Sequence, residues 1–151
     1  MGRFVAILMG SDSDREVMRK AEATLEEFGI PYETNVLSAH RKPRALVAYI
    51  DEAETRDVGV FICGAGMAAA LPGTVAGHTT KPVIGVPLES GGLGGLDSLL
   101  SIAQMPKGVP VACVAVNGTQ NAALLAVQIL AMGDAELSKK FEEFKQRQAE
   151  A

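Results

Sequence analysis

Short apolar runs and amphipathic segments alternate along the chain. The run at 4–9 is apolar at every position, which is typical of a strand buried on both faces. The segment at 15–28 carries apolar residues at helical spacing and stops at Gly29. The alternation then repeats, which predicts further strands at 32–37, 58–63, 82–86 and 109–116 and further helices at 43–55, 67–78, 96–105, 121–132 and 134–148. Pro72 and Gly73 interrupt the third helix and are expected to shorten, offset or kink it.

This order of elements predicts an α/β fold. Strands that alternate with helices, joined by connections long enough for crossovers, indicate a parallel sheet with helices on both faces. We therefore expect a three-layer αβα sandwich with a central parallel sheet, flavodoxin-like in form, since a barrel needs eight strands and about 250 residues. The 151 residues fit one domain, 1–151. Only 5% of them are aromatic, so the core is expected to consist mainly of aliphatic side chains.

Charge and cysteine usage exclude several classes of protein. A formal net charge of −4 argues against a nucleic-acid binder, which usually carries a basic stripe. Cys63 and Cys113 fall in expected buried strands and lack metal-ligand spacing, so both are expected to pack as small apolar residues without a bridge. The sequence shows no secretory signal, and no apolar run approaches the ~18 residues of a membrane span. A cytoplasmic location without membrane contact is therefore expected.

Three loops are expected to converge at one edge of the sheet, because open α/β sheets bind ligands at the carboxyl ends of their strands. They are Ser11–Asp14, Ser38–Arg41 and Gly64–Met67. His40 lies in the second loop, and imidazole is the side chain that exchanges protons near neutral pH. We interpret His40 as the candidate acid and base, against the alternative of a histidine that only caps or pads a loop.

The first loop carries two hydroxyls and two carboxylates before a helix. Free N–H groups and the helix dipole favour an anion there, and Ser11 and Ser13 can add hydroxyl donors to a phosphate. Serine and aspartate are also the usual N-cap residues, so Asp12 or Asp14 could simply be a cap. Two alternating Ser-Asp pairs exceed what one cap needs, which favours ligand contact, with a carboxylate accepting ribose hydroxyls.

Other residues support weaker interpretations. Arg41 offers a planar fork for a phosphate or carboxylate, the alternative being a surface ion pair. Gly64-Ala65-Gly66 lacks the third glycine and the acidic residue of a dinucleotide fingerprint, so it indicates either close approach to a flat ligand or a tight turn. His78 is expected to be a surface or helix-terminal residue. The glycine-rich stretch at 91–95 is expected to lie near a ligand or a neighbouring chain, and no motif implies a metal or a cofactor.

Six motifs run in order through nearly the whole chain: Met9-Gly10-Ser11-Asp12-Ser13-Asp14, Ser38-Ala39-His40-Arg41, Gly64-Ala65-Gly66-Met67-Ala68-Ala69 with Leu71-Pro72-Gly73, Pro82-Val83-Ile84-Gly85-Val86-Pro87, Leu96-Asp97-Ser98-Leu99 through Gln104-Met105-Pro106, and Asn121-Ala122-Ala123-Leu124-Leu125-Ala126. Together they strongly resemble the family of N5-carboxyaminoimidazole ribonucleotide mutases, also described as the catalytic subunit of phosphoribosylaminoimidazole carboxylase, from purine biosynthesis. The family pattern often reads G-A-G-G-A-A-H-L-P-G, so Ala70 stands where relatives often have histidine.

The resemblance implies conversion of N5-carboxyaminoimidazole ribonucleotide to 4-carboxy-5-aminoimidazole ribonucleotide without ATP, metal or organic cofactor. It implies that His40 protonates the leaving nitrogen and later removes the ring proton. The residues it implies for substrate binding are Ser11, Ser13, Asp14, Ser38, Arg41, Gly64, Ala65 and Gly66. It further implies a homo-octamer and a functional link to an ATP-dependent carboxyaminoimidazole ribonucleotide synthetase.

Two other functions stay open. The related carboxylase subclass uses free CO2 with unmodified aminoimidazole ribonucleotide, and Arg41 with Gly64-Ala65-Gly66 favours the mutase side. The second is a non-enzymatic nucleotide-binding module on the same fold, because fold alone does not decide function. A signalling receiver would need an aspartate at the end of the third strand, where this chain has Cys63 and Gly64.

Overall fold

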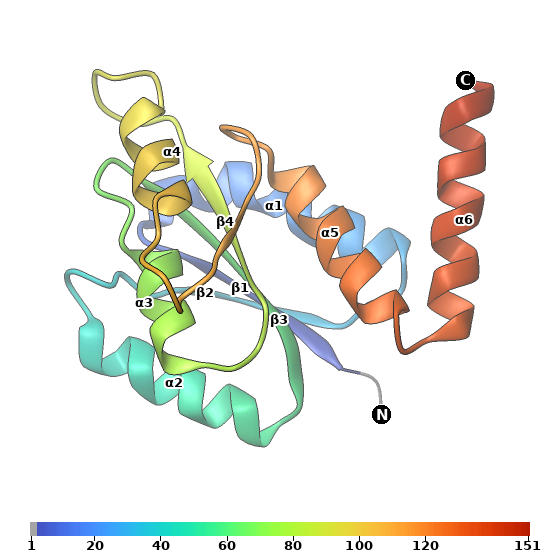
Figure 1. Ribbon diagram of the computed structural model, residues 1–151, viewed down its shortest axis with the longest axis horizontal. Helices are drawn as coiled ribbons and strands as arrows, with labels where there is room; N and C mark the ends of the chain where they lie inside the picture. The colour runs from blue at the N-terminus through green and yellow to red at the C-terminus, as the bar shows by residue number, and fades with distance from the viewer. Residues whose placement is uncertain (1–2) are drawn as a thin grey trace.

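Five parallel strands form the central sheet of the computed structural model, which describes residues 3–151 (Figure 1). The strands are β1 (Phe4–Met9), β2 (Tyr32–Val36), β3 (Val58–Gly66), β4 (Val83–Leu88) and β5 (Ala112–Cys113). Their order across the sheet is β2-β1-β3-β4-β5, and every neighbouring pair is parallel. This is the flavodoxin-like order, which places the topological switch point between β1 and β3.

Helices cover both faces of the sheet and complete the expected three layers (Figure 1). The helices are α1 (Arg15–Glu27), α2 (Pro43–Thr55), α3 (Leu71–His78), α4 (Leu96–Ala103), α5 (Thr119–Ala131) and α6 (Ala135–Glu150), and a short 3-10 turn at Asp12–Asp14 precedes α1. The apolar faces of α1 and α5, with Leu137 of α6, pack on one side of the sheet. Those of α2, α3 and α4 pack on the other. The predicted αβα sandwich is confirmed.

Strand β1 contributes side chains to the cores on both faces of the sheet and so connects the two helical layers. All six of its residues are buried, and they alternate between the two cores. Val5, Ile7 and Met9 face the α1 and α5 side, whereas Ala6 and Leu8 face the opposite side. Each large aliphatic side chain removed from water in this way contributes about 1.5–3 kcal/mol. The uninterrupted apolar run at 4–9 is therefore the sequence signature of a strand covered on both faces.

Strand β3 is longer than the predicted 58–63, because it continues through Gly66. In the ladder with β4, Gly64 pairs with Val86 and Gly66 with Leu88, so β4 also continues past the predicted 82–86. A Cβ on Gly64 would lie 2.4 Å from Sδ of Met18 on α1. The glycine at 64 therefore allows the helix to pack onto an extended strand, and it does not end the strand as the sequence suggested.

Two further boundaries differ from the prediction. The helix expected from 67 begins at Leu71, because Pro72 occupies its first turn, where a missing N–H costs nothing. Pro72 thus offsets the helix and does not kink it. The strand expected at 109–116 shortens to two residues at the sheet edge. Pro110 has no N–H to extend the ladder on the N-terminal side, and beyond Cys113 only isolated bonds from Val114 to Gly85 and from Asn117 to Pro87 follow.

Both cysteines are free, as expected. Cys63 is buried, and burial raises the pKa of its thiol far above the ordinary value. Cys113 is only half-buried, because its strand lies at the edge of the sheet and not in its interior. Between residues 3 and 151 no helix is both long and apolar enough to cross a membrane.

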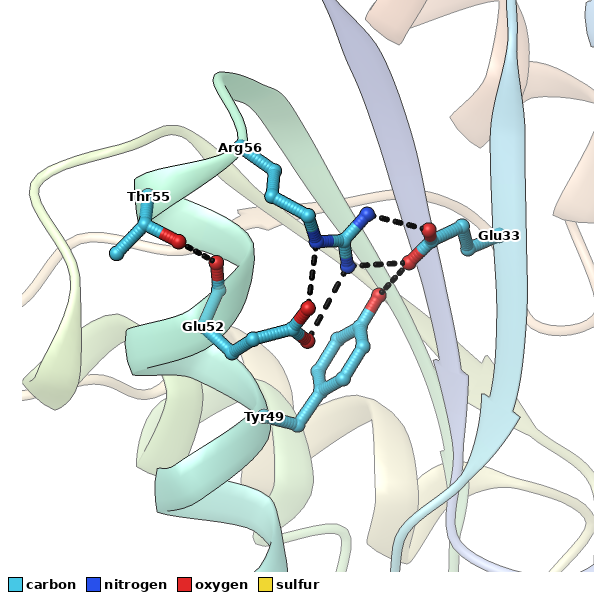
Figure 2. Close-up of polar contacts among 5 residues, drawn as sticks. All are labelled: Glu33, Tyr49, Glu52, Thr55 and Arg56. Carbon is cyan, nitrogen blue, oxygen red and sulfur yellow. Dashed lines mark hydrogen bonds and ion pairs between the residues drawn. The ribbon is translucent and has the colours of Figure 1, made fainter.

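A polar network ties β2 to the end of α2, as Figure 2 shows. Arg56 donates to both carboxylate oxygens of Glu33, at 2.5 and 2.9 Å, and its Nε donates to Glu52 at 2.6 Å. The Tyr49 hydroxyl donates to Glu33 at 2.9 Å. The guanidinium also stacks 5.0 Å from the centre of the Phe4 ring. These contacts join α2 to the sheet. None of the residues involved lines the pocket described next.

Candidate active site

A pocket of about 410 Å³ opens where the predicted loops meet, beyond the carboxyl ends of β1, β2 and β3. Its lining comes from four separate segments of the chain, and the fourth follows β4. The lining residues are Gly10, Ser11, Ser13, Asp14, Ser38, Ala39, His40, Arg41, Ala65, Gly66, Met67, Ala68, Ala70, Leu71 and Ser90. The expected convergence of the three loops is confirmed.

The loop after β1 places a pair of hydroxyls at the start of α1. Ser11 has an extended backbone and caps the 3-10 turn, because its Oγ accepts a hydrogen bond from the Ser13 N–H at 3.3 Å. The two hydroxyl oxygens lie 2.9 Å apart. Asp12 accepts from Arg15 Nε at 3.0 Å. The capping alternative therefore holds for Ser11, while both hydroxyls still line the pocket at the positive end of the helix dipole.

Asp14 directs a half-buried carboxyl to the same pocket. It makes no side-chain cap hydrogen bond to α1, so the helix does not use this carboxyl as a cap. Burial raises the pKa of Asp14 above its ordinary value, while the backbone of Ser11 and the positive charge of Arg41 act in the opposite direction. The pocket therefore contains a carboxyl that is partly desolvated and available to accept hydrogen bonds from a ligand.

The loop after β2 is a tight turn built by Ser38. Its Oγ accepts from the Arg41 N–H at 3.1 Å, and its carbonyl oxygen accepts from the Lys42 N–H at 2.8 Å. This turn presents the exposed His40 at the pocket wall. The guanidinium of Arg41 then donates through Nη2 to the Gly10 carbonyl at 2.8 Å, which joins the second loop to the first.

The loop after β3 forms the third wall. Ala65 and Gly66 line the pocket at the end of the strand. A Cβ on Gly66 would lie 2.9 Å from the Cβ of Ser90, so the glycine permits the segment after β4 to approach closely. Met67 follows with a positive φ of 53°.

Most of the residues predicted for the site meet in this pocket, with one exception. Ser11, Ser13, Asp14, Ser38, His40, Arg41, Ala65 and Gly66 all line it. Gly64 does not, because its backbone faces Met18 in the core. Ser90 was missed, although the glycine-rich stretch at 91–95 indicated a ligand or a neighbour nearby.

The remaining titratable candidates lie elsewhere. His78 is exposed at the end of α3, and its Nδ1 lies 2.9 Å from the Thr74 carbonyl oxygen, as expected of a helix-terminal residue. No three His, Cys, Asp or Glu side chains in the described part of the chain gather as ligands for a metal ion. The polar side chains of the pocket are thus an imidazole, a guanidinium, a carboxyl and four hydroxyls.

Comparisons with known proteins agree with this geometry. The AIR carboxylase family model matches residues 4–151. The N5-carboxyaminoimidazole ribonucleotide mutase of Saccharolobus solfataricus is 56% identical over 140 residues, which cover 93% of this chain and 89% of that protein. The phosphoribosylaminoimidazole carboxylase of Saccharomyces cerevisiae is 52% identical over 147 residues, 97% of this chain but 26% of that protein. The crystal structure of Treponema denticola PurE superposes with a TM-score of 0.91 at 33% identity, over 98% of this chain and 92% of that one. The chain therefore belongs to the AIR carboxylase family.

Proposed function

We propose that this chain is an N5-carboxyaminoimidazole ribonucleotide mutase of purine biosynthesis. The observation that carries the proposal is that His40 lines the same pocket as the Ser11 and Ser13 hydroxyls at the start of α1. A proton-transfer group and an anion site thus lie within the reach of one phosphorylated ligand. Relatives named as this mutase are 52–56% identical over at least 93% of the chain, which supports the choice of substrate.

The pocket residues divide into three groups in this proposal. The hydroxyls of Ser11 and Ser13, at the positive end of the α1 dipole, bind the phosphate. Asp14 accepts hydrogen bonds from the ribose hydroxyls, and Arg41 supplies positive charge while Ser38 holds its turn. The backbone of Ala65 and Gly66 forms the wall against the aminoimidazole ring, and Gly64 contributes indirectly by letting β3 extend to them.

His40 transfers the proton in both halves of the reaction. The bond between N5 and its carboxylate breaks, CO2 leaves, and the electron pair on nitrogen takes a proton from the imidazolium. Ring carbon C4 then attacks CO2 and forms a carbon–carbon bond, and the neutral imidazole removes the proton from C4. The proton donated in the first half is recovered in the second, so the reaction balances as an isomerisation. It requires that CO2 stay beside the ring between the two halves.

The carboxylase function is the second candidate, because a relative 52% identical to this chain carries that name. One experiment separates the two. The purified protein is given N5-carboxyaminoimidazole ribonucleotide at low bicarbonate, and in parallel aminoimidazole ribonucleotide at high bicarbonate. Turnover of the first alone supports the mutase. Turnover of the second alone supports the carboxylase, and inactivity with both supports a nucleotide-binding module.

Assembly belongs to the same proposal. We infer a homo-octamer, as the family resemblance implies. Three exposed leucines beside the glycine-rich loop, Leu93, Leu96 and Leu100, support a subunit contact there, since they are 51–65% exposed in the single chain. Light scattering after size exclusion measures the mass directly. The proposal also includes a cytoplasmic location and supply of the substrate by an ATP-dependent synthetase.

A further inference from the structure

Met67 combines two features that are unusual for a large apolar residue. Its φ of 53° lies in the left-handed region, which side-chain-bearing residues rarely adopt. Its side chain is 56% exposed, so packing in the core does not account for its position. The residue nevertheless lines the pocket, which places it at the pocket's opening.

The side chain of Met67 reaches from the loop after β3 to the loop after β4. A Cβ built on Gly91 would lie 3.6 Å from Cγ of Met67 and 3.8 Å from its Sδ and Cε. One residue earlier in each loop, Gly66 and Ser90 are also in close contact. Two loops that are distant in the sequence therefore meet at the rim of the pocket, and Met67 forms the apolar part of that contact.

We propose that the Met67 side chain keeps CO2 inside the pocket during carboxyl transfer. The inference rests on the proposed mutase function. CO2 is small, uncharged and weakly hydrated, so an apolar side chain at the opening hinders exchange with bulk solvent better than a polar one. The flexible thioether side chain of methionine adapts to a bound ring without a fixed shape.

The test measures whether the carboxylate carbon of the product comes from the substrate or from bicarbonate, in addition to the rate. Wild type, Met67→Gly and Met67→Leu convert N5-carboxyaminoimidazole ribonucleotide in buffer containing ¹³C-bicarbonate and carbonic anhydrase. The ¹³C fraction of the product and the free aminoimidazole ribonucleotide are then measured. A glycine at 67 accepts the positive φ, so Met67→Gly removes the side chain without straining the backbone. We expect Met67→Gly to incorporate several-fold more label and to release more aminoimidazole ribonucleotide, and Met67→Leu to resemble wild type.

Met132→Gly is the control, because Met132 is 89% exposed at the end of α5 and does not line the pocket. It should leave the labelled fraction unchanged. An active Met67→Gly whose labelled fraction equals that of wild type overturns the proposal for Met67. If Met67→Gly is too slow to assay, Met67→Ala gives the same comparison and the same criterion. Absence of product with wild type instead overturns the mutase function itself, so the two failures are distinguishable.

Discussion

Arg41 donates a 2.8 Å hydrogen bond to the carbonyl oxygen of Gly10 and thereby joins the loop after β2 to the loop after β1. Its own N–H is held by Ser38 Oγ at 3.1 Å, so backbone and side chain are both fixed. One guanidinium thus sets the distance between the two loops that carry the imidazole and the hydroxyl pair. The remaining N–H groups of the fork are available to an anion.

Replacing Arg41 should therefore weaken substrate binding more than chemistry. For Arg41→Ala we expect KM to rise by roughly one to two powers of ten, since a hydrogen bond to a charged group contributes about 1.5–3 kcal/mol. Arg41→Lys keeps the charge but not the planar fork, so it should recover only part of the loss. Steady-state kinetics with both variants provide the measurement. An unchanged KM in Arg41→Ala would place Arg41 outside the substrate site.

His40→Asn should separate binding from turnover. The amide keeps polar contacts at the pocket wall but cannot exchange a proton near neutral pH, so kcat should fall by roughly two to four powers of ten. Nucleotide affinity, measured by calorimetry with the product, should change little. His78→Asn is the matched control, because the His78 ring is exposed, its Nδ1 lies next to a carbonyl oxygen of its own helix, and it does not line the pocket. Near-normal turnover of His40→Asn would remove His40 from the mechanism.

The carboxyl of Asp14 is expected to lower the free energy of unfolding at neutral pH, although it contributes to nucleotide binding. Burial raises the pKa of its carboxyl above 3.8, so the folded state holds the proton more tightly than the unfolded state. The resulting cost is absent below pH 3.8 and is complete once the pH exceeds the folded pKa. Asp14→Asn should thus unfold at a higher temperature than wild type at pH 7.

The same variant should bind nucleotide at least about tenfold more weakly, since it loses a charged acceptor. Its gain in stability should shrink as the pH falls toward 3.8. Thermal unfolding at several pH values checks the first effect, and calorimetric titration with product checks the second. A lower unfolding temperature at pH 7 would show that the carboxyl stabilises the fold after all.

The three layers of the fold could be predicted from the sequence, because the apolar pattern of each segment indicates its secondary structure and burial without reference to distant residues. The apolar run at 4–9 indicates burial on both faces whatever lies beside it, and the regular alternation of elements then leaves few topologies. Pocket residues at the ends of the first two strands followed from that topology and from residue type. Ser11 and His40 are predicted in this way, because each follows directly from the position of a strand end.

The errors come from residues whose meaning depends on a distant partner. Gly64 suggested the end of a strand, but its lack of a side chain accommodates Met18 of α1. Gly66 has the corresponding relation to Ser90, which sequence reasoning did not place in the pocket. Close contacts between segments that are far apart in the sequence leave no periodic signal, so they emerge only from the assembled fold.

The network around Arg56 should make stability depend on pH in the acid range (Figure 2). Hydrogen bonds from Arg56 lower the pKa of Glu33 below its ordinary value of 4.5. The stabilisation is therefore fully present above pH 4.5 and is lost as the pH falls through the folded pKa. Both side chains are more than a third exposed, so solvent screening keeps this contribution small.

Glu33→Gln tests this relation by chemical denaturation. It should be less stable than wild type at pH 7, and the difference should vanish as the pH falls well below 4.5. Glu142→Gln serves as the control, since Glu142 is exposed in the middle of α6, on the opposite face of the sheet from α2. A deficit in Glu33→Gln that persists in acid would mean that packing, and not charge, holds the network together.

Gly64 and Gly77 allow a matched test of why position 64 of β3 requires a glycine. In Gly64→Ala the new methyl would lie 2.4 Å from Met18 Sδ, so the core must shift, and we expect a loss of about 1–3 kcal/mol. In Gly77→Ala nothing lies within 4 Å of the new methyl, and alanine is the better helix former. That variant should be unchanged or more stable by up to about 1 kcal/mol.

Adding Met18→Ala to Gly64→Ala relieves the overlap, so the double variant should be more stable than the sum of the two single losses predicts. Strict additivity would show that Met18 is not what requires a glycine at 64.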